Sequence, residues 1–276
     1  MEDMSKLAKG YDARSEHEYN RLSRHAYNSL EQITNLHFIK KYVKKGNRVL
    51  DAGGGPGKYL LDFSKLGFKT TILDISKGNI KYAKSSVKNS PKSVQNKIEN
   101  FIVGDVRKLD MFDSNSFDSV LSLGATLSHI PTEKDRIKAI KELVRVVKVN
   151  SYVFISVVGF YSVLKTVPFY LDGDICNPDY DLLYKTGDDF RDGIGFHFYK
   201  AEELKKQAKK CGLEIIEMYG CESLSSNLVD QTNLLAEDKK KWKKWKEIVI
   251  EMANVPAVVD NSSHFVLIGR KVKNAE

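Results

Sequence analysis

Three glycines at alternating positions follow an acidic residue early in the chain: Asp51 precedes Gly53, Gly55 and Gly57. Apolar residues lead into the acid and an apolar helical pattern follows the glycines, which predicts a buried strand, a tight turn and a helix start. Glycine tolerates positive φ and lets a ligand lie against bare backbone. The first turn of a helix offers free N–H groups. These residue types at this spacing favour a nucleotide site at the corner of an α/β sheet.

The surrounding residues argue against two common nucleotide sites. Lys58 stands where a dinucleotide-binding fingerprint has its third glycine, which disfavours a Rossmann dehydrogenase. No Gly-Lys-Ser or Gly-Lys-Thr follows, so the turn is not a Walker loop that binds phosphates. A glycine cluster also occurs in ordinary strand–helix turns, so the segments that follow must decide.

Asp74 is the second acid with a chemical role in this pattern. It ends a strand expected over residues 69–74 and lies 19 residues beyond Gly55. A carboxylate at the carboxyl end of a second strand can accept hydrogen bonds from both hydroxyls of a ribose. The alternative is that Asp74 caps the helix expected from Ser76, because aspartate is a favoured N-cap residue.

Asp105 is the third acid, and it follows a strand expected over residues 98–103. Its carboxylate can accept from the exocyclic amine of adenine while the Val106 N–H donates to a ring nitrogen. The alternative is an ordinary turn aspartate.

Strands and helices alternate over the first half of the chain, which predicts a parallel sheet with right-handed crossovers. Besides the strand that ends at Asp51, the expected strands cover residues 69–74, 98–103, 117–124, 152–158, 213–218 and 264–270. Helices are expected from Ser76, from the capping residue Thr132 and over residues 201–211 and 237–253.

The N-terminal region, residues 1–46, is helical in pattern. Apolar residues recur with a period near 3.6, which favours amphipathic helices. These residues are Leu30, Ile33, Leu36, Ile39 and Val43. Tyr11, Arg14 and Tyr19 make the first part unusually aromatic and cationic. The region therefore forms either two helices packed on the sheet or a lid over the ligand.

The alternation breaks at Gly159, and residues 159–200 form a long insertion that is rich in aspartate and aromatic residues. Long insertions inside compact domains are usually functional. This one follows the carboxyl end of a strand, the side on which open α/β sheets bind ligands. We expect a cap over a substrate pocket.

Composition limits the remaining choices. The chain has 276 residues and a formal charge of +8, which suits a single domain over residues 1–276. No apolar run approaches the roughly 18 residues of a membrane helix, and the first residues show no apolar signal core, so we expect a cytoplasmic protein without a membrane partner. The three cysteines, Cys176, Cys211 and Cys221, form no Cys-x-x-Cys pair, so we expect no metal site.

Taken together, Asp51 with its glycines, Asp74, the segment Gly104-Asp105-Val106 and the late strand pair resemble class I S-adenosylmethionine-dependent methyltransferases. The segments Tyr11-Asp12 and Glu18-Tyr19-Asn20-Arg21-Leu22 are similar to those of a prokaryotic group that acts on small molecules. The resemblance runs from about Tyr11 to Arg270. It implies a Rossmann-like, doubly wound α/β sheet of seven strands, mostly parallel with the last strand antiparallel, together with the N-terminal lid and the inserted cap.

The resemblance also implies roles for individual residues. The cofactor would be S-adenosylmethionine and the product S-adenosylhomocysteine. The backbone at Gly53, Gly55 and Gly57, behind Asp51, would lie against the methionine part. Asp74 would hold the ribose, Asp105 and Val106 the adenine, and the Leu123 carbonyl the methionine amino group. Tyr11 and Arg14 would close over the cofactor from the lid.

Methyl transfer from a sulfonium is an in-line displacement, so alignment and exclusion of water supply much of the rate. A general base is needed only where the acceptor must lose a proton. The candidates are His129, just past the fourth strand, and His197, in the aromatic segment Gly195-Phe196-His197-Phe198-Tyr199. Either histidine can equally be a packed or exposed residue without catalytic duty.

The acceptor is indicated mainly by absences. The segment Ser122-Leu123-Gly124-Ala125-Thr126 lacks the Asn/Asp-Pro-Pro-aromatic run of enzymes that methylate exocyclic amines of bases or glutamine. A small-molecule acceptor is therefore favoured. An RNA methyltransferase, suggested by the pI of about 9.1 and the lysines between Lys239 and Lys246, and a non-catalytic S-adenosylmethionine-binding module stay open as alternatives. The oligomeric state and the atom methylated are not indicated.

Overall fold

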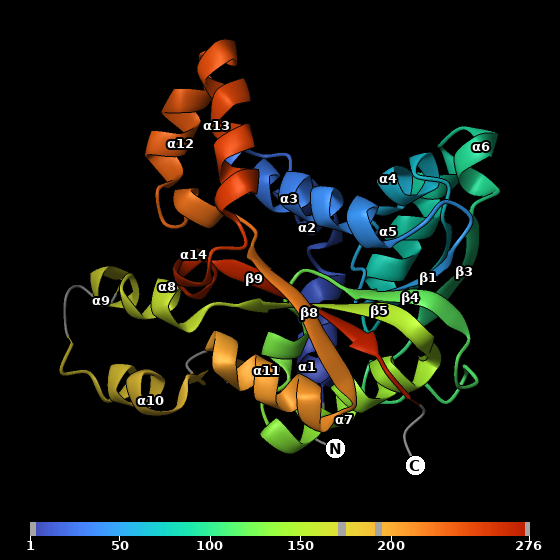
Figure 1. Ribbon diagram of the computed structural model, residues 1–276. Helices are drawn as coiled ribbons and strands as arrows, with labels where there is room; N and C mark the ends of the chain where they lie inside the picture. Colours follow the sequence, from blue (N-terminus) through green and yellow to red (C-terminus); the bar gives the residue numbers. More distant parts are fainter. Residues whose placement is uncertain (1–3, 171–174, 191–194, 274–276) are drawn as a thin grey trace.

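The computed structural model describes residues 4–170, 175–190 and 195–273. A seven-stranded sheet runs through its centre in the order β3-β2-β1-β4-β5-β9-β8 (Figure 1). The strands are β1 (Arg48–Ala52), β2 (Lys69–Asp74), β3 (Ile98–Val103), β4 (Phe117–Ser122), β5 (Val147–Val158), β8 (Leu213–Gly220) and β9 (His264–Lys271). Strands β1 to β5 are parallel, and β9 is antiparallel to both β5 and β8. The predicted Rossmann-like, mostly parallel sheet is confirmed.

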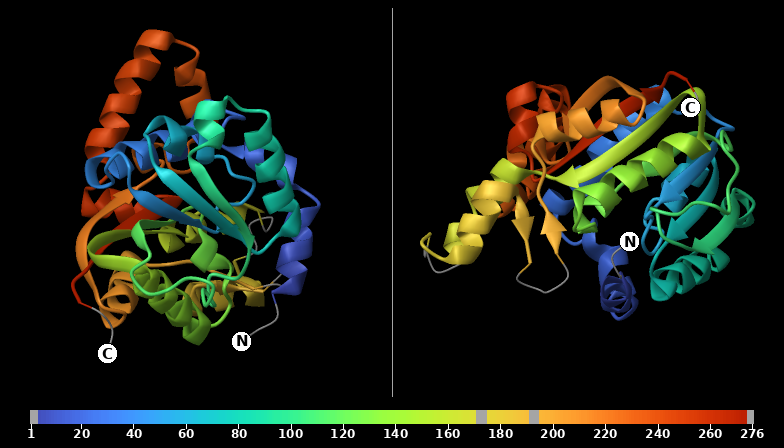
Figure 2. Two further views of the ribbon diagram at one scale, coloured as in Figure 1. Left: turned by 90° about the vertical axis from the view of Figure 1, so that its right-hand side faces the viewer. Right: turned by 90° about the horizontal axis from the view of Figure 1, so that it is seen from below.

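Helices cover both faces of the sheet (Figure 2). They are α1 (Ser5–Asp12), α2 (Ser15–Arg21), α3 (Ala26–Tyr42), α4 (Leu60–Lys65), α5 (Lys77–Lys88), α6 (Lys92–Gln95), α7 (Glu133–Val146), α11 (Ala201–Lys210), α12 (Val229–Ala236), α13 (Lys239–Met252) and α14 (Pro256–Asn261). Successive strand residues point to opposite faces. Leu50 packs in the core that includes residues of α7 and α11, whereas Val49 packs with residues of α3 and α4.

Local sequence signals account for most element boundaries. The Thr132 hydroxyl accepts from the Asp135 N–H at 3.2 Å and begins α7, and Ser76 caps α5 in the same way through Asn79. Strand β5 starts at Val147, five residues earlier than expected. It continues through Asn150, whose φ of 63° is a left-handed conformation that asparagine tolerates better than most residues.

Helix α3 buries polar residues beside the apolar face that its period predicts. Leu30, Ile39 and Val43 are buried and Ile33 and Leu36 are partly buried, but Glu31, Thr34 and Asn35 are buried as well. Glu31 and Asn35 have partners beneath the helix, whereas Thr34 Oγ1 has no hydrogen-bond partner among the described residues. The Asn35 amide donates to the Tyr59 hydroxyl at 2.9 Å, and Glu31 pairs with an arginine of α2. The N-terminal region forms three helices where two were expected, because the helical conformation is interrupted between α1 and α2.

The insertion after β5 forms α8 (Phe160–Leu164), α9 (Val167–Tyr170), α10 (Pro178–Thr186) and the short hairpin β6 (Asp188–Asp189) and β7 (Phe196–His197). Figure 1 shows α8, α9 and α10 extending away from the sheet at one side. Parts of the predicted cap, residues 171–174 and 191–194, lie outside the described residues.

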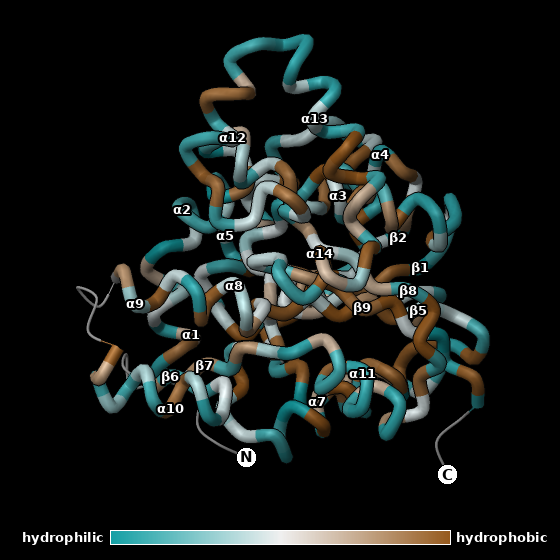
Figure 3. Tube along the Cα trace, turned by 60° about the vertical axis from the view of Figure 1, so that its left-hand side comes forward, coloured by the Kyte–Doolittle hydropathy of each residue, from teal (hydrophilic) through white to brown (hydrophobic). Residues whose placement is uncertain are grey.

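Hydropathy follows this architecture. Figure 3 shows apolar residues gathered along β5 and β9 in the centre and polar residues on the outer helices. Within the described parts of the chain, none of the helices has both the length and the apolar composition needed to cross a membrane.

Helix α1 is attached to the sheet domain through the start of α5. Asp12 Oδ1 accepts from the Ser76 hydroxyl at 2.6 Å and from the Gly78 N–H at 2.7 Å. A Cβ atom at Gly78 would lie 2.7 Å from Asp12 Cα and 2.8 Å from Asp12 O. Because both of these are backbone atoms, only glycine permits this contact.

We predict that Gly78→Ala releases α1 from α5 while the sheet stays folded. Losing a helix-capping contact costs about 1–2 kcal/mol, which corresponds to about a tenfold larger open population of α1. Limited proteolysis within residues 4–14 should therefore become about tenfold faster. Gly10→Ala is the matched control, because a Cβ atom there meets nothing within 4 Å. Equal protection of α1 in both variants would contradict the docking role of Gly78.

Candidate functional site

A pocket is lined by residues that follow β1, β2, β3 and β4 and by residues of α1, α2 and α3. Its floor is the glycine turn at residues 53–55, and Leu7, Tyr11 and Arg21 line it from the N-terminal helices. Carboxyl ends of parallel strands meet at one edge of a sheet, which explains why residues far apart in the sequence converge here.

Asp51 is the most unusual side chain in this pocket. It is fully buried, and neither of its carboxylate oxygens has a hydrogen-bond partner among the described residues. Burial, together with the neighbouring charge of Asp74, raises the pKa of Asp51 to about 7. A buried carboxylate without a partner is costly, so this position suits a ligand that brings a positive charge or a hydrogen-bond donor.

Asp74 is also buried, but its carboxylate is held by the protein. One oxygen accepts from the Gly55 N–H at 2.8 Å, and the other accepts from the Ser76 N–H at 2.9 Å and the Asn79 amide at 3.2 Å. Burial raises the pKa of Asp74, and these hydrogen bonds oppose the rise. Asp74 therefore holds the glycine turn in place and also lines the pocket, while Ser76 is the N-cap of α5.

The three predicted glycines differ in role. All have positive φ, 81° at Gly53, 56° at Gly55 and 81° at Gly57. A Cβ atom at Gly55 would meet only the Asn79 amide at 3.9 Å, which leaves open space for a ligand. Gly57 does not line the pocket. A Cβ atom there would lie 2.8 Å from Leu60 Cδ1, so Gly57 permits helix packing.

Asp105 and Val106, the residues predicted to contact adenine, both line the pocket. The Asp105 carboxylate is held by Arg107, whose Nη2 lies 2.6 Å from Oδ2 and whose Nε lies 2.9 Å from the same oxygen. Arg107 also reaches Asp135 of α7 with Nη1 at 2.7 Å. The sequence did not single out Arg107, although an arginine two residues after the acid is the kind of partner that fixes a carboxylate in one orientation.

Tyr11 and His129 close the pocket from opposite sides. The Tyr11 hydroxyl lies 2.9 Å from His129 Nε2, and burial raises the pKa of Tyr11 to about 12. The Arg14 guanidinium does not line the pocket but lies 4.7 Å from the centre of the Tyr11 ring. Phe196 of the insertion packs edge-on against the His129 ring, at 4.6 Å between centroids. The described residues of the insertion thus contact His129 without lining the pocket.

The loop after β4 contributes Leu123 and Thr126 to the pocket. The Leu123 carbonyl accepts from the Thr126 hydroxyl at 3.2 Å and keeps a second lone pair for a ligand. A Cβ atom at Gly53 would collide with the Thr126 side chain, so the loop lies directly on the glycine turn.

His197 is not at the pocket. Its Nδ1 lies 2.6 Å from Asp188 and its Nε2 lies 2.8 Å from Glu203. Burial by itself lowers the pKa of His197, but these two carboxylates raise it overall. With both ring nitrogens engaged, His197 joins the hairpin of the insertion to α11, and its placement argues against a role as general base.

Three charged pocket residues, Glu18, Arg21 and Glu31, had no predicted role in the site, although Glu18 and Arg21 belong to the N-terminal segment that carries the family resemblance. Arg21 Nη1 lies 2.8 Å from Glu31 Oε2, and Nη2 lies 3.3 Å from Oε1, in a bidentate pair. Glu31, Thr34 and Asn35 recur at helical spacing beside Phe38, so a polar stripe on α3 was the available signal.

The fold and this site resemble those of the class I S-adenosylmethionine-dependent methyltransferases. Residues 50–155 match the family model described as a methyltransferase domain. These residues hold most of β1, all of β2 to β4 and most of β5, and they carry the glycine turn and the three pocket aspartates.

Three relatives illustrate the comparison. A Bacillus subtilis protein, YqeM, whose name assigns it provisionally to the methyltransferases, is 25% identical over 147 residues, which are 53% of this chain and 56% of that protein. The match thus spans about half the length of that relative. The glycine/sarcosine N-methyltransferase of Aphanothece halophytica is 26% identical over 66% of this chain and 72% of its own. A SAM-dependent methyltransferase of Methanosarcina mazei has a similar fold, with a TM-score of 0.59 and 22% identity. The match covers 85% of this chain and 97% of that one.

The residues present fit S-adenosylmethionine, the cofactor of this family. The unpartnered Asp51 carboxylate can receive a donor or a cation, and Gly55 leaves room for a ligand against the backbone. The charge balance agrees, because the pocket carries five carboxylates and two cations in a chain with a net charge of +8. The pocket acids are Glu18, Glu31, Asp51, Asp74 and Asp105, and the cations are Arg21 and Lys58.

We predict that Asp51→Asn stabilises the ligand-free protein at alkaline pH. The folded state raises the pKa of Asp51 from 3.8 to about 7, so ionisation favours the unfolded state above pH 3.8 and the penalty is complete above pH 7. The free energy of unfolding of the variant should exceed that of the wild type by an amount that grows with pH, to at most about 4 kcal/mol. Urea unfolding of both proteins at pH 5.5 and 8.5 measures this difference in the free energy of unfolding.

Asp110→Asn is the control for Asp51→Asn, since its carboxylate is 68% exposed and its replacement should leave stability unchanged at both pH values. A wild-type protein that is more stable than Asp51→Asn at pH 8.5 would refute the unpartnered state of the Asp51 carboxylate.

We also predict that His197→Gln weakens the fold without affecting cofactor affinity. The raised pKa of His197 means that its charge stabilises the fold fully below pH 6.5 and ceases to do so as pH rises through the folded-state pKa. The free energy of unfolding should fall by about 1–3 kcal/mol at pH 6 and by less at pH 9. His17→Gln, 56% exposed, is the control. A loss of cofactor affinity in His197→Gln would contradict this prediction and indicate that His197 acts directly at the cofactor site.

Proposed function

We propose that this protein transfers a methyl group from S-adenosylmethionine to a small-molecule acceptor. The observation that supports it best is the fully buried and unpartnered Asp51 carboxylate beside the glycine turn. A cationic ligand at this place removes the energetic cost of that carboxylate. The bound cofactor would supply an activated sulfonium methyl group, and the rest of the work belongs to the chain.

The chain's own residues would bind, orient and enclose the ligand. In this proposal Asp74 accepts hydrogen bonds from the ribose diol, Asp105 and Val106 read the adenine edge, and the Gly53–Gly55 backbone lies along the methionine part. Tyr11 of α1 reaches across the pocket to His129 and would exclude water. Fixing the reacting atoms in line within an enclosed site supplies much of the acceleration for such a displacement.

A small acceptor is favoured over RNA by the charge of the pocket. Five carboxylates against two cations repel a polyanion. The lysine-rich helix α13 projects away from the sheet in Figure 1, and none of its residues lines the pocket. The Aphanothece halophytica relative is named for two small acceptors, glycine and sarcosine.

His129 is the proposed general base where the acceptor must lose a proton. It lines the pocket and shares a hydrogen bond with the Tyr11 hydroxyl, which fixes the orientation of its ring. His197 is no longer proposed, because it lies outside the pocket and both of its nitrogens are engaged.

The test is transfer of a labelled methyl group from S-adenosylmethionine to a cell extract divided into small-molecule, RNA and protein fractions. We expect label in the small-molecule fraction. In Asp74→Ala, cofactor affinity measured by calorimetry should fall about 5- to 150-fold, because charge-assisted hydrogen bonds to the ribose are worth about 1–3 kcal/mol.

Asp110→Ala is the matched control and should bind like the wild type. Label in the RNA fraction, with cofactor-dependent binding that falls steeply with salt, would replace the proposed acceptor class. Tight cofactor binding without transfer to any fraction would favour the non-catalytic module. Unchanged affinity in Asp74→Ala would refute the ribose role.

A further inference from the structure

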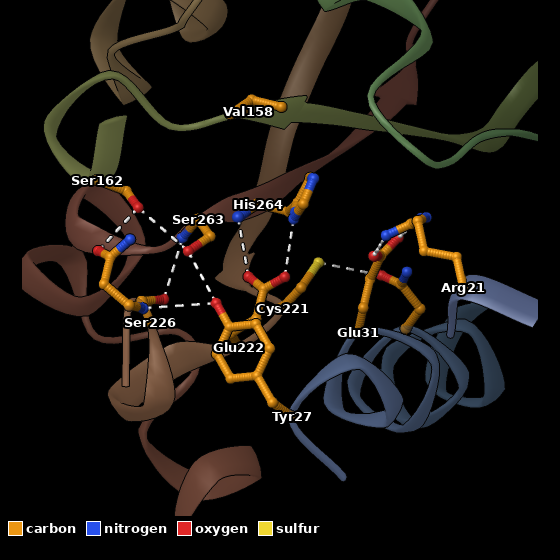
Figure 4. Close-up of polar contacts among 12 residues, drawn as sticks. Arg21, Tyr27, Glu31, Val158, Ser162, Cys221, Glu222, Ser226, Ser263 and His264 are labelled. Carbon is orange, nitrogen blue, oxygen red and sulfur yellow. Dashed lines mark hydrogen bonds and ion pairs between the residues drawn. The ribbon is translucent and has the colours of Figure 1, made fainter. Parts of the chain in front are cut away.

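Behind the pocket lies a second cluster of charged side chains from three separate elements. Glu31 comes from α3, Glu222 follows β8, and His264 begins β9 (Figure 4). One ligand atom from each residue lies within 4.8 Å of the other two. Glu31 and Glu222 are 1% and 2% exposed. Burying two carboxylates this completely is expensive unless positive charge compensates them.

Glu222 holds the His264 ring in a fixed orientation. Its Oε1 lies 2.8 Å from His264 Nδ1, and its Oε2 accepts from the His264 backbone N–H at 2.9 Å. Because Glu222 Oε1 is hydrogen-bonded to Nδ1, a cation shared by Glu222 and the imidazole would take the place of the proton between these two atoms.

Glu31 links this cluster to the cofactor pocket. Its carboxylate pairs with Arg21 on one side and faces His264 and Glu222 on the other. An ionised carboxylate offers about four lone-pair positions, so the bidentate bonds to Arg21 leave two for another partner. Glu31 also lines the pocket, so a ligand held by the cluster lies next to the cofactor site.

We propose that Glu31, Glu222 and His264 bind one divalent first-row transition-metal ion. One imidazole nitrogen and two carboxylates form a donor set that suits Zn²⁺ and similar ions, and three protein ligands leave a position open for a small molecule. A divalent cation would supply the positive charge that the two buried carboxylates require.

The open position would be directed to the wall that Glu31 shares with the pocket. A metal ion there could hold an acceptor oxygen or nitrogen next to the cofactor and lower its pKa. This use of the ion depends on the proposed methyl transfer, whereas binding of the ion does not.

Calorimetric titration of the full-length, chelator-treated protein with ZnCl₂ tests the site. We expect one ion per chain, and at least about 100-fold weaker binding in Glu222→Gln and in His264→Gln. His25→Gln, an exposed histidine, is the matched control and should bind like the wild type. Replacing Glu31 is avoided, because it would break the bidentate pair with Arg21 at the wall of the cofactor pocket.

A second measurement does not rely on variants. X-ray absorption of the zinc-loaded wild type should show nitrogen and oxygen neighbours at about 2.0–2.2 Å and no sulfur, which excludes binding by the exposed Cys176. No uptake of zinc, sulfur neighbours, or equal binding in all variants would overturn the proposal and leave the cluster as an ion-pair network.

Calorimetry with S-adenosylmethionine separates this proposal from the function. Glu222 and His264 do not line the pocket, so both variants should keep the cofactor affinity of the wild type. Loss of zinc binding in these two variants, with cofactor binding retained, would support the metal site independently of the proposed function. Zinc binding in a protein that does not bind the cofactor would refute the proposed function and leave the metal site standing.

Discussion

The burial of negative charge at the carboxyl ends of β1 and β2 is the constraint on which the rest of the site depends. Asp51 and Asp74 lie on adjacent parallel strands, and burial raises the pKa of both. Asp74 is compensated by the glycine turn and the start of α5, whereas Asp51 is left without a partner. A fold that keeps such a group unpaired gives up stability in exchange for a strong preference for a positively charged ligand.

The same region determines where the N-terminal helices lie. Asp12 places a third carboxylate near the start of α5, where free N–H groups and the helix dipole favour negative charge. That contact brings Tyr11 to His129, so the loop after β4 and helix α1 enclose the pocket together. Helix α1 and the glycine turn are thereby coupled through one short segment, residues 74–78, which touches the pocket at one end and α1 at the other.

On the opposite side, α3 connects the pocket to the antiparallel end of the sheet through polar and charged side chains as well as through apolar packing. Arg21, Glu31, His264 and Glu222 lie one after another from α2 to the strand ends of β8 and β9. Such a buried chain is weak evidence for stability, because hydrophobic residues would pack at lower cost. Its position against the pocket wall therefore points to ligand chemistry and not to fold stability alone.

The sequence by itself determined which residues with a chemical role follow which strand. Asp51, Asp74 and Asp105 each follow an apolar strand, and the glycines between them need positive φ, so local patterns were enough to predict the sheet and the pocket floor. Tertiary structure decided what those patterns cannot encode. Periodicity predicts the apolar face of α3, but the folded helix also buries Glu31 and Asn35, because their partners Arg21, Tyr59 and Tyr219 come from other parts of the chain. Likewise His129 and His197 look alike in sequence, and only packing puts one in the pocket and the other between two carboxylates.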